Sequence, residues 1–230
     1  MRVFANYPTR SLTVLELLIV IGCLSILAAL LLPALARPKS NVNRGRCIYN
    51  LKGIGLSFRT WALDNRDKYP MQVSVTNGGT MELVSRGIAF PHFLVMSNEL
   101  STPKVLVCPE EIDSKVIAAS TFAQIVPGNF SNTIPFTNDN NLSYFVGVDA
   151  DPSQPAALLS GDKNLMINNA AAIHGLQSIG TNTAVEWLRP RHNGGGNICL
   201  ADGSVQQVDS KGLRALLLSS GVVTNRLAIP

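Results

Sequence analysis

The sequence lacks the cysteine spacings of a structural zinc site. Its four cysteines are Cys23, Cys47, Cys108 and Cys199, and no two of them form a C-x-x-C pair. Because such sites need pairs of cysteines or histidines at short spacing, zinc is not expected. Two alternatives remain for the three cysteines after Cys23. One pair forms a disulfide and leaves a free thiol, or all three are buried as small apolar side chains.

The sequence also has little that would bind nucleotides or nucleic acids. The run Gly194-Gly195-Gly196 is followed neither by Lys-Ser/Thr nor by the start of a helix, so it is not a phosphate-binding loop. The net charge is +4, but six of the 19 basic residues lie in the first 46 positions, where Glu16 is the only acid. These basic residues flank an apolar segment, which explains the positive net charge without a nucleic-acid partner. No nucleic-acid partner is therefore expected.

One long apolar run occupies the N-terminal region. Twenty uncharged residues extend from Leu17 to Ala36. A helix of about 20 residues, rising about 1.5 Å per residue, crosses a hydrocarbon layer of about 30 Å. The run therefore predicts a transmembrane segment. No small-x-small cleavage site follows it closely, so a standard secretory signal peptide is not expected.

Glu16 at the front edge of this run indicates a function. On insertion scales a carboxylate at the centre of a membrane helix costs roughly 2.5–3.5 kcal/mol. The residues Ser11-Leu12-Thr13-Val14-Leu15-Glu16 follow a short leader that contains Arg2 and Arg10. They resemble the N-terminal signature of type IV prepilins and type II secretion pseudopilins. In that family a basic leader is removed and a glutamate stands four places after the new N-terminus.

A second motif lies near the C-terminus. Nine residues separate His192 from Asp202-Gly203, which resembles the His-x9-Asp-Gly motif of many prepilin-like proteins. Asp-Gly between short apolar segments predicts a hairpin with a two-residue type I′ turn, joining strands at Asn197–Ala201 and Ser204–Val208. We interpret the motif as structural, with an acid–base or metal role for His192 and Asp202 as the alternative.

The periodicity of apolar residues predicts further elements. From Ile48 to Ala62 they recur at three- and four-residue spacings, which predicts an amphipathic helix to about Leu63. Lys104–Cys108 and Leu142–Val148 are predicted strands, and a final amphipathic helix is predicted from about Ser210 to Ser219. The resulting fold class is α+β, with a long N-terminal transmembrane and stalk helix packed on a small antiparallel β-sheet head, as in pilins.

The predicted domains follow from these segments. They are a leader peptide at 1–11, the transmembrane half of the N-terminal helix at 12–36, an amphipathic stalk helix at 37–65, and a globular head at 66–230. The predicted localisation is a single-pass inner-membrane protein with a cytoplasmic leader and a periplasmic or extracellular head.

The resemblance implies a structural function. A prepilin peptidase would cut between Ser11 and Leu12, the new amine of Leu12 would be N-methylated, and Glu16 would pair with that amine on a neighbouring subunit. Pairing would cancel two charges that are costly in apolar surroundings. The expected protein is a pseudopilin or minor pilin without enzymatic activity. Its expected partners are the prepilin peptidase, other pilin-like subunits through the N-terminal helix, and the inner membrane before assembly.

Two alternatives remain open. The chain could be a membrane-anchored envelope binding protein or enzyme that acts through His192, Asp202 or the loop at Asp149, or its head could bind polysaccharide. Asp149, Asp151 and Asp162 form an acidic group that could share a calcium ion, or they are turn residues in solvent. No other cofactor is expected.

Overall fold

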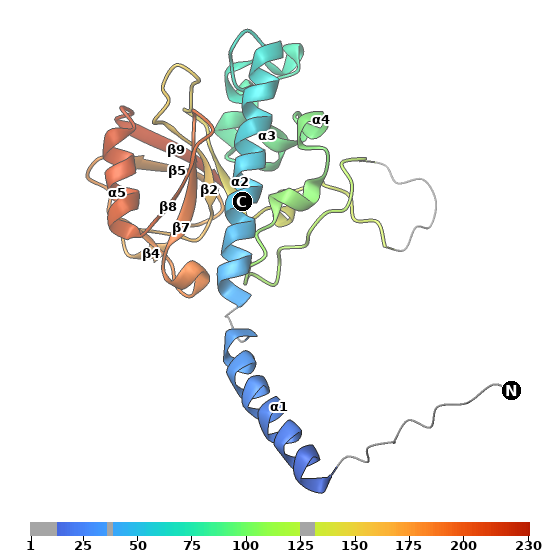
Figure 1. Cartoon of the computed structure of the whole chain (residues 1–230). Coiled ribbons are helices and arrows are strands. Elements are labelled where there is room, and N and C mark those ends of the chain that lie inside the picture. The colour runs from blue at the N-terminus through green and yellow to red at the C-terminus, as the bar shows by residue number, and fades with distance from the viewer. Residues whose placement is uncertain (1–12, 36–38, 125–131) are drawn as a thin grey trace, which may run out of the picture. The chain divides into compact units, whose positions relative to one another are not determined.

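The computed structural model describes residues 13–35, 39–124 and 132–230, without the side chains of 28–41. It divides into two units, Met1–Asn41 and Val42–Pro230, which are considered separately. Helix α1 (Val14–Leu35) belongs to the first unit, and most of helix α2 (Lys39–Asp64) belongs to the second (Figure 1).

The predicted transmembrane segment requires a correction. In the described part of the chain, no helix combines the length and apolarity needed to cross a lipid bilayer. This finding overturns the transmembrane half predicted at 12–36 and the transmembrane helix of the predicted fold. The prediction rested on the length of an uncharged run and assumed one helix continuing from 12–36 into the stalk. The structure instead describes two helices, since α1 ends at Leu35 and α2 begins at Lys39.

The second unit contains a six-stranded sheet in which every neighbouring pair is antiparallel. The α+β class with an antiparallel sheet is therefore confirmed. The strand order is β5-β9-β1-β2-β7-β8, and a smaller sheet has the order β4-β3-β6. The strands are β1 (Tyr144–Gly147), β2 (Leu158–Asp162), β3 (Leu165–Ile167), β4 (Ala170–Ala171), β5 (Gly175–Gly180), β6 (Val185–Trp187), β7 (Gly196–Leu200), β8 (Val205–Val208) and β9 (Thr224–Ile229).

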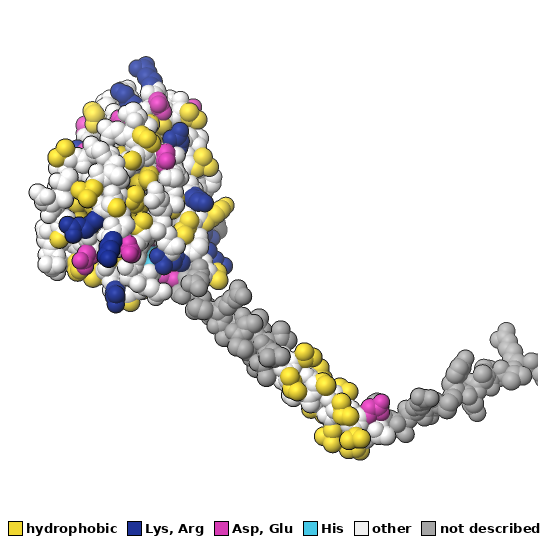
Figure 2. All heavy atoms as spheres, turned by 60° about the vertical axis from the view of Figure 1, so that its left-hand side comes forward, with side chains coloured by type: hydrophobic (Ala, Val, Ile, Leu, Met, Phe, Trp, Pro, Cys, Tyr) yellow, Lys and Arg dark blue, Asp and Glu magenta, His cyan; other side chains and the backbone are white. Residues whose placement is uncertain are grey.

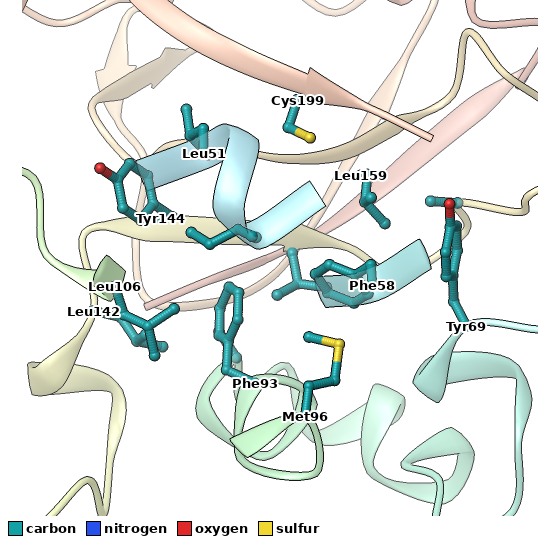
Figure 3. Packing of buried hydrophobic residues seen from close by; sticks show 14 of the residues in the cluster. Leu51, Phe58, Tyr69, Phe93, Met96, Leu106, Leu142, Tyr144, Leu159 and Cys199 are labelled. Carbon is teal, nitrogen blue, oxygen red and sulfur yellow. The ribbon is translucent and has the colours of Figure 1, made fainter. Parts of the chain in front are cut away.

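Helix α2 covers one face of the six-stranded sheet. Its residues Cys47, Leu51, Ile54 and Phe58 are all fully buried, at the spacing that places side chains on one side of a helix. They pack against Tyr144 and other inward side chains of the sheet, and against residues of the segments that follow α2 (Figure 3). The periodicity of the sequence predicted Leu51, Phe58 and Ala62 on this buried face, but not Cys47 or Ile54.

Helix α5 (Ser210–Ser219) covers the opposite face (Figure 1). Its N-cap Asp209 accepts a hydrogen bond of 2.8 Å from the Gly212 N–H, which satisfies one free donor of the first turn. Leu213 and Leu217 are buried in a second apolar cluster with residues of both sheets. Successive strand residues therefore contribute to different cores, as Tyr144 and Phe145 do.

Short helices fill the segments between α2 and β1. The predicted strand at Lys104–Cys108 is instead η4 (Pro103–Leu106), because Pro103 begins a helical turn and the Thr102 hydroxyl accepts from the Lys104 N–H. The other short helices of this region are η1 (Pro70–Gln72), η2 (Val75–Asn77), η3 (Met81–Arg86), α3 (Phe90–Leu94), α4 (Ser97–Leu100) and η5 (Asp139–Asn141). A further short helix, η6 (Arg191–Asn193), lies between β6 and β7.

Candidate functional site

A left-handed run of backbone ahead of β7 sets the position of His192. His192, Asn193 and Gly194 have positive φ angles of 51°, 56° and 79°, a region that non-glycine residues adopt at some cost. This run turns the chain at the end of η6, where Gly194 follows as the C-cap. Arg191 and His192 are both buried, each 2% exposed. The motif histidine therefore lies inside the head.

Asp162, at the end of β2, is the centre of the polar cluster around His192. Its Oδ1 accepts a hydrogen bond of 2.8 Å from Arg191 Nη2, and its Oδ2 accepts two of 2.8 Å from the backbone N–H and Nδ2 of Asn197. His192 Nε2 lies 3.3 Å from Oδ2. Burial alone would raise the pKa of Asp162, but Arg191, His192 and Asn197 together lower it below its usual value. We therefore describe Asp162 as a buried carboxylate.

Two glutamates complete the cluster from the segment after Cys108. Glu110 Oε2 lies 2.7 Å from His192 Nδ1, without hydrogen-bond alignment, and it accepts the His192 backbone N–H at 3.2 Å. Glu111 Oε2 accepts from Arg191 Nη1 at 3.0 Å. The imidazole of His192 thus has a carboxylate beside each of its nitrogens.

The cysteines Cys47 and Cys108 form a disulfide next to this cluster. It joins α2 to the segment after η4, and Cys108 Sγ lies 3.5 Å from His192 Nε2. Cys199 is a buried free thiol, and burial raises its pKa to about 12. Of the two alternatives for these cysteines, the disulfide with one free thiol is therefore the correct one.

A cleft beside Glu111 and Arg191 is not lined by the inner residues of the cluster. This cleft of about 530 Å³ is lined by Glu111, Lys163 and Arg191, but neither His192 nor Asp162 lines it. A substrate in this cleft would meet paired charges, since Lys163 Nζ is 3.4 Å from Asp113 Oδ2 and Arg191 is bound to Glu111.

Asp202 and Gly203 lie at the other end of β7, at a turn that docks on α2. Gly203 has a positive φ of 84° and Asp202 does not, so the turn is not the predicted type I′, which needs positive φ at both positions. The N–H of Leu200 donates to the carbonyl of Ser204 at 2.9 Å, which leaves three residues in the loop, a common hairpin alternative. Asp202 Oδ1 accepts from the Ser204 N–H at 2.7 Å.

This turn contacts Arg59 and Gly55 of α2 and also Tyr69, which follows α2. The carbonyl of Ala201 accepts hydrogen bonds from Arg59 Nη1 at 3.4 Å and from the Tyr69 hydroxyl at 2.5 Å. A Cβ atom on Gly55 would lie 3.3 Å from the Gly203 Cα atom. His192 and Asp202-Gly203 thus fix the two ends of β7 against α2, one beside Cys47 and the other beside Gly55 and Arg59.

The structure does not gather the three aspartates into one acidic group. Asp149 pairs with Arg226, with Oδ1 2.5 Å from Nη2. Asp151 accepts from Gln72 Nε2 and, at 2.8 Å, from the Ser153 N–H. Asp162 lies in the buried cluster. Within residues 13–35, 39–124 and 132–230, the one group with the spacing of metal ligands is Cys47, Cys108 and His192.

At the N-terminus, Glu16 lies in the first turn of α1. Its backbone N–H donates to the Thr13 hydroxyl at 3.3 Å, so Thr13 caps the helix, and a carboxylate in the first turn complements the helix dipole. The proposed cleavage site between Ser11 and Leu12 lies outside the described residues.

Sequence reasoning placed His192 and Asp162 in two separate groups, which the structure brings together. It missed Arg191, Asn197, Glu110 and Glu111. The sequence signal that could have found three of these residues is their position beside residues already noted. Arg191 directly precedes His192, and Glu110 and Glu111 follow Cys108-Pro109.

The chain was compared with models of protein families, with curated proteins and with solved structures, and no match was found.

Proposed function

We propose that this chain is a structural subunit of a pilin-like filament, of the pseudopilin or minor-pilin kind, and not an enzyme. The observation that carries the proposal is the apolar surface of α1. Ten large apolar side chains between Val14 and Leu27 are 49–75% exposed, and Figure 2 shows them covering the described part of this helix, with one acidic side chain near its beginning. A helix that is apolar on all sides must bury this surface against a partner, and we propose that helices of neighbouring copies are that partner.

A stripe on α2 supports the same proposal. Val42, Tyr49, Leu56 and Leu63 are spaced seven residues apart and are 59–79% exposed. They lie on the helix surface away from the core residues such as Leu51. Apolar residues at this repeat form the contact line between packed helices, so we propose that this stripe continues the contact between subunits.

Burial of the motif residues supports a structural role for the head. His192 and Asp162 are bound to their neighbours and do not line the cleft, and Asp202-Gly203 contacts α2. The Cys47–Cys108 disulfide supports a head in an oxidising compartment, periplasmic or extracellular, with the leader on the cytoplasmic side. The prepilin peptidase and other pilin-like subunits are the proposed partners.

Two matched pairs of variants test the proposal in the native host. Glu16→Gln removes the charge proposed to pair with the Leu12 amine, and Glu186→Gln removes an exposed charge on β6 of the head. Leu56→Glu charges the α2 stripe, and Leu218→Glu charges an equally exposed leucine on α5, at 63% against 66%.

The amount of chain in sedimentable filaments after mechanical shear is the readout, normalised to total chain. We expect Glu16→Gln and Leu56→Glu to reduce it at least tenfold, and the two control variants to leave it unchanged. Equal recovery of all four variants would refute assembly through these helices.

A further inference from the structure

We propose that Cys47, Cys108 and His192 bind a zinc ion when the Cys47–Cys108 disulfide is reduced. Short sequence spacing gives no sign of this site, because the three ligands come from α2, from the segment after η4 and from η6. The inference is independent of the proposed assembly.

The distances between the donor atoms fit a tetrahedral zinc site. In a tetrahedral site with Zn–S near 2.3 Å and Zn–N near 2.0 Å, a sulfur and a nitrogen lie about 3.5 Å apart, and a nitrogen and an oxygen about 3.3 Å apart. Cys108 Sγ and His192 Nε2 are 3.5 Å apart, and His192 Nε2 and Asp162 Oδ2 are 3.3 Å apart. Two edges of the tetrahedron are therefore already present, with Asp162 at the fourth position.

The side chains around His192 and Asp162 would hold these two ligands in place. A histidine that binds a metal through one nitrogen nearly always has a carboxylate, carbonyl or water at the other. Glu110 Oε2 is the carboxylate beside His192 Nδ1, at 2.7 Å but without hydrogen-bond alignment, which leaves Nε2 as the nitrogen for a metal. Asp162 is in turn held by Arg191 and Asn197. The surroundings of His192 thus resemble the outer shell of a zinc site.

The required change is local. The two sulfurs must separate from bonding distance to about 3.8 Å, the S–S edge of such a tetrahedron. A side-chain rotation of Cys47 on α2 would open the pair while Cys108, His192 and Glu110 stay in place, so the two distances given above would be kept.

The chemistry balances with a dithiol as reductant. The dithiol gives two electrons and two protons to the disulfide and becomes a cyclic disulfide itself, which leaves thiols at Cys47 and Cys108. Zinc then displaces the two thiol protons, which pass to solvent. Two thiolates neutralise the charge of the ion, so the buried cluster gains no net charge.

The test uses the full chain carrying Cys23→Ser, reduced anaerobically with a dithiol that is then removed. Cobalt(II) is added as a spectroscopic probe and zinc(II) as its competitor. We expect one equivalent of cobalt with tetrahedral d–d bands and thiolate charge transfer, displaced by one equivalent of zinc. Glu110→Gln should weaken zinc binding about 10–100-fold, the usual effect of losing an outer-shell partner. His174→Gln, an exposed imidazole, is the control and should bind like the parent chain.

A second measurement needs no variant of the cluster. Alkylation of the reduced chain, followed by peptide mass spectrometry, reports each thiol separately. Zinc should slow alkylation of Cys47 and Cys108 at least tenfold and leave Cys199 unchanged. Unprotected Cys47 and Cys108, or an octahedral cobalt spectrum without charge transfer, would overturn the proposal.

Discussion

Two glycines on α2 allow the docking of the β7–β8 turn to be tested. A Cβ atom on Gly55 would lie 2.6 Å from Cys199 Sγ and 3.4 Å from the Gly203 carbonyl oxygen. A Cβ atom on Gly53, two residues earlier, would have nothing within 4 Å. Gly53→Ala and Gly55→Ala therefore differ in packing but make the same chemical change on the same helix.

The expected magnitudes follow from two opposing effects. Replacing glycine by alanine inside a helix stabilises the protein by about 1 kcal/mol, and this gain applies to both variants. Overpacking a filled core costs about 1–3 kcal/mol, and this cost applies only to Gly55→Ala. The difference in free energy of unfolding between the variants should therefore be about 1–3 kcal/mol, with Gly53→Ala more stable than the parent chain.

Urea unfolding followed by tryptophan fluorescence measures this difference, because Trp61 lies on α2 and is buried. In the double variant Gly55→Ala, Cys199→Ala the sulfur is absent, so the penalty of Gly55→Ala should shrink by a coupling energy of about 0.5–3 kcal/mol. The backbone of Gly203 would still be close. Equal unfolding free energies for Gly53→Ala and Gly55→Ala would refute the close contact between α2 and this turn.

Two further predictions concern buried polar groups. Burial lowers the pKa of His92 to about 4 from 6.5, so the unfolded chain binds a proton between these pH values that the folded chain does not. The free energy of unfolding should therefore fall by about 3 kcal/mol from this group as pH decreases from about 6.5 to 4. In a pH series of urea unfolding midpoints, His92→Gln should show a smaller decrease than the parent chain. The same decrease in both would contradict a lowered pKa of His92. Asp162→Asn removes the charge that pairs with buried Arg191, so calorimetry should show a loss of about 3–5 kcal/mol; a loss below about 1 kcal/mol would show that the pair contributes little.

The sequence was informative where local periodicity determines the element. The buried face of α2, the strand around Tyr144, the hairpin near Asp202-Gly203 and the helix Ser210–Ser219 were predicted because each follows from neighbouring residues. The type of the hairpin turn was wrong, since contacts with Arg59 and Tyr69 accompany a three-residue loop instead.

The rest depends on contacts between distant residues. Strand β9 joins β5 to β1, and no local pattern specified that pairing. The strand predicted at Lys104–Cys108 was wrong, because a run of four apolar residues does not distinguish a strand from a helical turn. In the charged cluster, Arg191 contacts Asp162, 29 residues away in sequence, and Glu111, 80 residues away. Short sequence motifs could therefore indicate single residues of the cluster but not that they lie together.

We propose that the chain is processed and assembled as a pilin-like subunit. The intact mass and N-terminal sequence of the chain purified from its own host would test this proposal directly. We expect a chain that begins at Leu12 and carries one added methyl group. A chain that begins at Met1, with no methyl group, would contradict it.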